Sequence, residues 1–176
     1  MRCLSDVECL DWLEVNNIDA ADERGLPEAV GDCEILFAAP TVGRTQQRVA
    51  RELVEWLGNF ENALLWIADW PLYQPEEMAI VLTMRRGYAE HRALLAAPGL
   101  LFAWEERELL IAWLFFLTTF GWDGYLFPSP FAGSMLQTSH DDFLRITSSN
   151  AEHLALAASL PRKYDLAIYR ETLGNR

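Results

Sequence analysis

An unbroken apolar run, LLIAWLFFL at residues 109–117, limits what this chain can fold into more than any other stretch. A membrane-spanning helix needs about 20 apolar residues, and this run is bounded by charges at residues 105–108 and at Asp123. It is therefore too short to span a bilayer. Acidic residues suit a helix N-terminus and Gly121 suits a C-terminal cap, so the pattern predicts a helix at about 105–120. Because this helix has no polar face, we expect it to be buried nearly all round, as the central helix of a layered fold.

The chain before this helix alternates between strand-like and helix-like segments. Residues 33–39, CEILFAA, form a short apolar run, and residues 44–60 then carry an apolar stripe at helical spacing. The rhythm repeats with an apolar run at residues 62–69 and a helix that Pro75 opens and that continues to about Gly87.

The remaining segments are shorter. Residues 88–104 lack a sustained period and predict a connection to the buried helix, and residues 16–32 predict a polar loop. Residues 5–15 permit a helix or a strand, and residues 165–173 a last strand or a ragged terminus. Asn150 suits the cap of a short helix. Three β-favouring runs are expected at residues 122–129, 134–139 and 143–149.

These patterns predict one α/β or α+β domain over residues 1–176, with a mixed β-sheet flanked by helices. The 26 acidic and 14 basic residues give a net charge of −12. Residues 1–34 hold ten acidic and two basic side chains, so this acidic N-terminal region carries −8. Residues 35–176 carry the remaining −4, and the α/β core is expected at residues 33–176. Such a charge opposes binding to phosphate backbones, so nucleic acid is not an expected partner.

The cysteines indicate a reducing compartment. Cys3, Cys9 and Cys33 are odd in number and form no C-x-x-C pair, so neither a disulfide framework nor a zinc ribbon is predicted. We expect core thiols. No basic region followed by an apolar segment and a cleavage site opens the chain, and the expected localisation is cytoplasmic, with no membrane contact.

Few residues suggest chemistry. The sequence SHDD at residues 139–142 places a hydroxyl, an imidazole and two carboxylates together, but neighbouring side chains of an extended segment point to opposite faces, so a turn is the preferred interpretation. His91 and His153 stand alone, without metal-ligand spacing. No glycine-rich nucleotide motif is present. We therefore expect no catalytic residue, no metal and no cofactor.

Two carboxylates lie at aromatic-rich strand ends. Asp69 follows the run at residues 62–69 and Asp123 enters the run at residues 122–129. They would form a carboxylate pair if those strands were neighbours, which is the arrangement that a glycosidase needs. The preferred interpretation is that both residues close strands by bonding turn backbone.

Tryptophan is the strongest compositional feature, with seven residues. Trp56, Trp66 and Trp113 lie within helix or strand patterns and are expected in the core. A second group of aromatic residues lies near strand ends, where an amphipathic ring can meet a partner. These predicted surface anchors are Trp70, Tyr73, Trp122 and Tyr125.

Three segments carry a resemblance to a class of known proteins: LLWIADWPLYQPEE, APGLLFAWEERELL and FGWDGYLF followed by SHDDF. Together they make residues 33–147 resemble small, acidic, tryptophan-rich bacterial proteins, some of them similar to immunity proteins of toxin systems. The resemblance implies protein binding and transfers no functional residue.

The leading hypothesis is a cytoplasmic protein-binding module that neutralises a basic toxin or enzyme, with acidic residues recruiting the partner and the strand-end aromatics holding it. The predicted acidic contacts are Asp6, Glu8, Asp11 and Glu14. One alternative is a small-molecule or carbohydrate-active enzyme that uses Asp69, Asp123 or His140. A structural or scaffold domain is the other.

Overall fold

A computed structural model of the chain describes residues 1–22, 25, 27–29, 31–71 and 74–172. Its frame is an eight-stranded sheet in which every neighbouring pair is antiparallel, in the order β1-β4-β3-β5-β6-β7-β2-β8. The strands are β1 (Arg2–Leu4), β2 (Cys33–Ala38), β3 (Asn62–Asp69), β4 (Gly99–Ala103), β5 (Asp123–Ser129), β6 (Ser134–Thr138), β7 (Phe143–Ser148) and β8 (Ile168–Thr172). The single α+β domain expected from the sequence pattern is confirmed.

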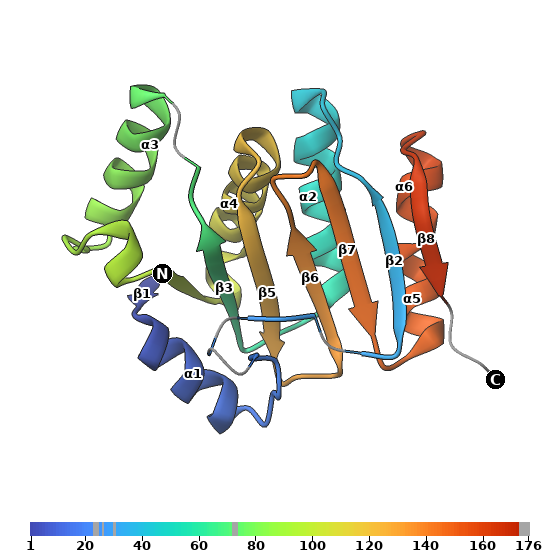
Figure 1. Cartoon of the computed structure of the whole chain (residues 1–176), viewed down its shortest axis with the longest axis horizontal. Coiled ribbons are helices and arrows are strands. Elements are labelled where there is room, and N and C mark those ends of the chain that lie inside the picture. Colours follow the sequence, from blue (N-terminus) through green and yellow to red (C-terminus); the bar gives the residue numbers. More distant parts are fainter. Residues whose placement is uncertain (23–24, 26, 30, 72–73, 173–176) are drawn as a thin grey trace.

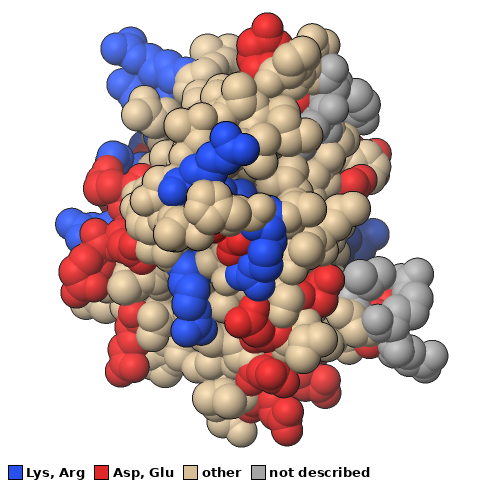
Figure 2. Space-filling model, turned by 90° about the vertical axis from the view of Figure 1, so that its left-hand side faces the viewer, with Lys and Arg blue, Asp and Glu red and all other residues tan. Residues whose placement is uncertain are grey.

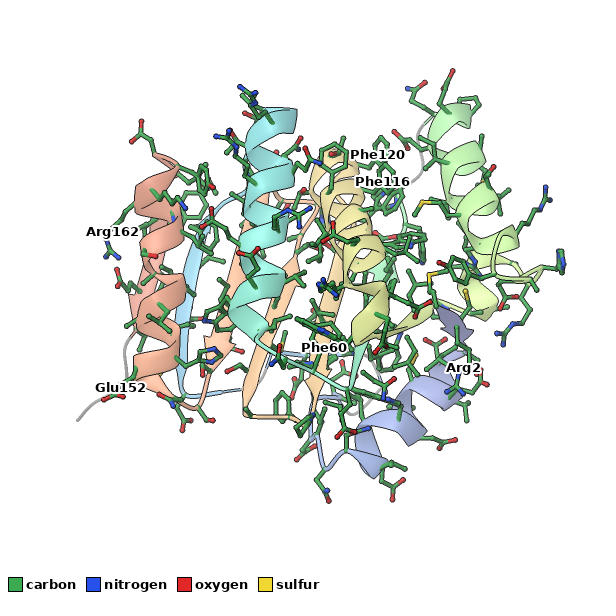
Figure 3. All side chains as sticks on the ribbon, turned by 180° about the vertical axis from the view of Figure 1, so that it is seen from behind. Arg2, Phe60, Phe116, Phe120, Glu152 and Arg162 are labelled. Carbon is green, nitrogen blue, oxygen red and sulfur yellow. The ribbon has the colours of Figure 1, made fainter. Side chains whose placement is uncertain are left out.

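Helices lie mainly on one face of this sheet. The α-helices are α1 (Asp6–Val15), α2 (Gly43–Leu57), α3 (Pro75–Arg86), α4 (Arg107–Phe120), α5 (Ala151–Ala157) and α6 (Ser159–Lys163), with short 3-10 turns η1 (Leu94–Ala96) and η2 (Trp104–Glu106). Figures 1 and 3 show α2, α4 and the α5–α6 pair side by side on one face, with α3 at the end of this layer. Helix α1 lies at a lower corner, and the segment that follows it crosses the opposite face (Figure 1).

The central helix α4 is where the sequence predicts a helix, and Gly121 ends it at a φ of 63°. Its inner face is buried against the sheet and α2 at Leu110, Ile111, Trp113, Leu114 and Leu117. Phe115 and Phe116 are only half-buried and Thr119 is exposed, so the expectation of burial nearly all round is wrong. The reason is that α4 lies in a single helical layer, whose outer side meets solvent. Among the described residues, no helix is long and apolar enough to cross a membrane.

The sheet has an apolar core on both faces. The larger one lies under the helices, where Ile35 and Phe37 of β2 alternate with half-buried residues as expected for a strand. The smaller one lies on the opposite face, where Cys9 and Leu13 of α1 pack with Trp66 of β3. Because β3 is covered on both faces, its residues 63–67 are buried without alternation.

Three uncertain segments are now resolved. Residues 5–15, for which a helix and a strand were both open, form the helix α1, and Ser5 and Glu8 make the capping box that opens it. Residues 99–103, expected to be a connection, are strand β4. The tail contributes the exposed edge strand β8. All three cysteines are buried free thiols, as expected for core positions.

Candidate functional site

The upper edge of the sheet in Figure 1 gathers two carboxylates and an imidazole. Asp69 ends β3 and pairs in register with Asp123, which begins β5, after an irregularity in the ladder. His140 lies in the turn between β6 and β7. Since neighbouring strands are antiparallel, the end of β3, the start of β5 and the β6–β7 turn meet at one edge. One ligand atom from each of the three residues lies within 4.8 Å of the others. We call Asp69, Asp123 and His140 the edge site.

Asp123 holds His140 in a fixed orientation. The backbone N–H of His140 donates to Asp123 Oδ1 at 2.7 Å, and its ring Nδ1 lies 2.8 Å from Asp123 Oδ2. When the ring is neutral, a proton on Nδ1 satisfies this contact and leaves the Nε2 lone pair free. Asp141 Oδ1 is 3.6 Å from Nε2. A carboxylate that orients a histidine in this way is a common support for metal ligation and for general-base catalysis.

The turn that carries His140 is fixed by local bonds. The backbone N–H of Ser139 donates to the carbonyl of Phe143 at 3.1 Å, and Asp142 adopts a φ of 57°. The Thr138 hydroxyl donates to the carbonyl of Trp122 at 2.8 Å, which ties the β6–β7 hairpin to the start of β5. The predicted turn at residues 139–142 is thus present, and it also positions an imidazole.

Electrostatics favour a cation in the edge site. The hydrogen bond that the His140 ring donates to Asp123, followed by the charges of Asp123, Asp141 and Asp69, raises the pKa of His140 above its ordinary value. The same negative field that holds this proton would hold a metal ion in its place. Carboxylate and imidazole ligands together suit Zn²⁺ or Mn²⁺. No other group of three such residues stands close enough for one ion in the described part of the chain.

An apolar groove adjoins the edge site and shares Asp69 with it. Its volume is about 530 Å³, and it is lined by Asp69, Trp70, Met78, Leu82, Leu94 and Leu95. The size lies within the range of roughly 300–1,000 Å³ that is usual for small-molecule pockets. We call this the α3 groove, because Met78 and Leu82 belong to α3.

The predicted surface anchors are placed differently from the expectation. Trp122 is fully buried and Trp70 is 8% exposed, so the expected exposure of these two rings is wrong. The centroids of these two rings are 5.3 Å apart, and the Trp70 ring also packs edge-to-face with that of Trp113. A ring next to a strand end turns inward here because the helical layer extends over that edge. Tyr125 is half-buried and accepts a hydrogen bond from Gln137, and Tyr73 lies outside the described residues.

The predicted acidic contacts divide into two pairs. Asp6 accepts a hydrogen bond from the indole N–H of Trp66, and Glu8 caps α1 and pairs with Arg92. Asp11 and Glu14 are exposed further along the helix. Among the described residues, the carboxylates of Asp11 and Glu14 therefore make no ion pair or hydrogen bond, whereas those of Asp6 and Glu8 do.

Sequence reasoning named all three residues of the edge site and considered Asp69 and Asp123 as a pair if their strands were neighbours, but it did not place His140 beside them. The signal available was that Asp69 and Asp123 lie at strand ends and that His140 lies in a turn. Comparison with known proteins adds nothing to this assignment, since no family model, curated protein or solved structure matches the chain.

Proposed function

We propose that the protein binds a divalent transition-metal ion, Zn²⁺ or Mn²⁺, through Asp69, Asp123 and His140. The single observation that carries the proposal is the convergence of these groups, from three separate segments, within 4.8 Å. Two carboxylates and one imidazole supply ligands of the kinds that these ions take. Asp123 Oδ2 and His140 Nδ1 already lie 2.8 Å apart, and an ion bound to both would take the place of the proton that they share.

The reaction class supported by this site is metal-assisted hydrolysis of a small molecule. Three protein ligands leave coordination positions for water and substrate, as in catalytic rather than structural metal sites. A bound ion would lower the pKa of a coordinated water and polarise a substrate oxygen. The α3 groove adjoins the site through Asp69 and offers an apolar surface to the rest of the substrate. The enzyme alternative that the sequence suggests uses Asp69, Asp123 or His140, and the proposal joins all three around an ion.

Isothermal titration of EDTA-treated protein with Zn²⁺ and with Mn²⁺ tests the metal site. We expect one site per chain, and a loss of affinity of roughly 100-fold in Asp69→Asn and in His140→Gln. His91→Gln removes an exposed imidazole outside the cluster, and Asp142→Asn removes a carboxylate from the same turn while keeping a residue that tolerates positive φ. Both control variants should bind like the wild type.

Two results would overturn the proposal. One is the absence of saturable uptake of either ion by the wild-type protein. The other is uptake that Asp69→Asn and His140→Gln leave unchanged, because that would place the ion elsewhere.

A further inference from the structure

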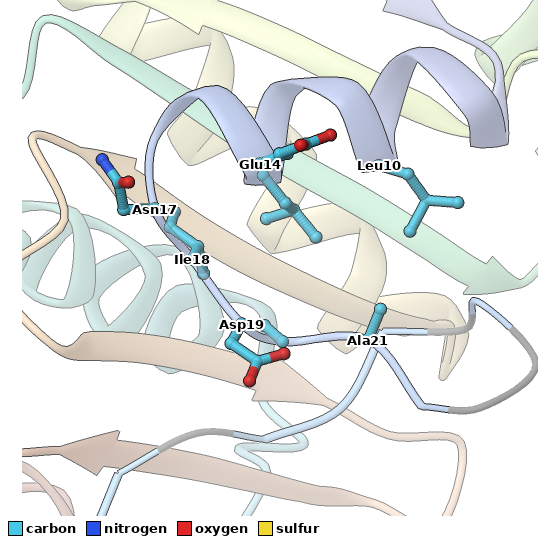
Figure 4. A pocket seen from close by; sticks show the side chains of 8 residues that line it. Leu10, Glu14, Asn17, Ile18, Asp19 and Ala21 are labelled. Carbon is cyan, nitrogen blue, oxygen red and sulfur yellow. The ribbon is translucent and has the colours of Figure 1, made fainter.

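A second groove lies beside α1, far from the edge site in the sheet. It has a volume of about 500 Å³ and involves the last turns of α1 and the residues that follow. Its lining includes the apolar residues Leu10, Leu13, Ile18, Ala20 and Ala21, and two carboxylates, Glu14 and Asp19, line it as well (Figure 4). We call this the α1 groove. Leu13 and Ile18 are buried, whereas Glu14 and Asp19 are exposed. The groove therefore combines an apolar floor with an acidic rim.

The rim charges are not used within the described chain. Neither Glu14 nor Asp19 has an ion pair or a side-chain hydrogen bond to another described residue. At the other end of α1 the situation differs, because Arg92 pairs with Glu8 and Glu90. The face seen in Figure 2, which carries α1 and α3, shows several acidic groups at its lower end and basic groups near its centre, with further acidic groups along its left side and at its top.

Glu14 does not contribute to the stability of helix α1. This residue lies in the last turn of α1, where the helix dipole disfavours a negative charge, and that turn contains no basic residue. Asp11 and Val15, the latter 79% exposed, are further exposed residues of α1, although neither lines the groove. Unpaired acids and exposed apolar groups that weaken a free helix are expected where another molecule covers them.

We propose that the α1 groove docks an arginine- or lysine-bearing surface segment of a partner protein. The aliphatic stem of such a side chain lies on the apolar floor, and its cationic head pairs with Glu14 and Asp19. Charge complementarity selects this occupant, since the chain carries −12 and residues 1–34 carry −8 of it. A partner with a basic surface is also what a protein that neutralises a basic toxin or enzyme requires. This inference goes beyond the metal site and does not depend on it.

The probe is a blocked tetrapeptide with two arginines between two leucines, titrated into ¹⁵N-labelled full-length protein in EDTA. Amide shifts should be confined to α1 and residues 16–22. A matched peptide with citrulline in place of arginine has the same shape without the charge, and we expect it to bind about tenfold more weakly.

Two double variants separate the groove from the overall charge. Glu14→Gln with Asp19→Asn should weaken binding about fivefold or more. Glu55→Gln with Glu152→Gln removes two exposed charges elsewhere and should change affinity by less than about twofold. Amide spectra of all variants check that the fold is retained, and Glu14→Gln alone serves if the double variant is unfolded.

Three outcomes would overturn the inference. They are no amide shifts with several millimolar arginine peptide, shifts that map outside the α1 groove, and equal losses in the two double variants. The His140→Gln variant should bind the peptide like the wild type, so failure of the metal proposal would leave this result intact.

Discussion

The upper edge of the sheet brings carboxylates together, whereas the α1 groove keeps them apart around an apolar floor. Asp69 and Asp123 meet His140 within 4.8 Å, while Glu14 and Asp19 border a groove of about 500 Å³. Converging ligands suit a small ion that needs several at once, and separated acids suit an elongated cation with an apolar stem. The same side-chain type thus serves two kinds of recognition, and the spacing decides which.

The two sites also differ in what supports them. The edge site is assembled from β3, β5 and the β6–β7 turn, over a core that contains Trp70, Trp113 and Trp122. The α1 groove is assembled from neighbouring residues of one helix and the segment after it. We therefore expect core substitutions to damage the edge site more than the groove.

The largest expected effect is a loss of stability when the core beneath the edge site is changed. Trp122→Ala should lower the free energy of unfolding by about 3–5 kcal/mol, because it opens a cavity at a fully buried position. Its indole N–H has no hydrogen-bond partner among the described residues, so the loss is one of packing. Urea unfolding followed by circular dichroism measures the change.

Trp12→Ala is the matched control, because Trp12 is a half-buried tryptophan on α1. It should cost less than half as much as Trp122→Ala. Equal costs for the two substitutions would show that the edge site has no stronger support than α1.

The next effect is the pH dependence of metal binding at the edge site. Asp123 raises the pKa of His140 above its ordinary 6.5, and an ion must displace this proton. Affinity for Zn²⁺ or Mn²⁺ should therefore rise by about tenfold per pH unit up to the raised pKa and level off above it. Titration calorimetry at several pH values from about 5.5 to 8.5 tests this.

Protonation of His140 affects the stability of the fold in the opposite direction to metal affinity, because it stabilises the fold at low pH. Because the folded-state pKa of His140 is raised, the pair with Asp123 stabilises the fold fully below pH 6.5, and this contribution is lost as pH rises through the raised value. His140→Gln should remove both pH dependences. A variant that keeps the wild-type slope of metal affinity would mean that another group titrates.

The smallest expected effect is a difference in stability between variants at the two ends of α1. Asp6→Ala leaves the Trp66 indole N–H without its acceptor, and Glu8→Ala removes half of the capping box, so each should cost about 1 kcal/mol. Asp11→Ala and Glu14→Ala should stay within about 0.5 kcal/mol. Thermal unfolding at fixed pH ranks the four variants. Equal losses at both ends would contradict the division of these acids into structural and recognition pairs.

The sequence could predict local structure but not which distant segments meet. Periodicity and caps suffice for α4 and its end at Gly121, because these depend on residues close in the chain. The pairing of β3 with β5 joins segments that are far apart in the chain, and β4, which pairs with the other edge of β3, was itself expected to be a connection. Without that pairing, Asp69 and Asp123 remain two isolated strand-end carboxylates.

The same limit applies to side-chain direction at strand ends. Trp122 precedes β5 by one residue, where a ring can face solvent or the core with equal ease. Packing against Trp70 and Phe120 decides in favour of the core. The same holds for the acidic residues of α1. Asp6 and Glu8 bind Trp66 and Arg92, which come from distant segments, and the local sequence does not reveal these contacts.

The most direct measurement of the metal site is the titration of the three histidine rings by ¹H–¹⁵N NMR, with and without saturating Zn²⁺. Without the ion, His140 should titrate above its ordinary pKa. With the ion, the NMR signals of the His140 ring nitrogens should shift and should no longer change with pH near neutrality. Addition of Zn²⁺ should not shift the ring signals of His91 and His153. A His140 ring that titrates identically in the presence and absence of Zn²⁺ would contradict the account.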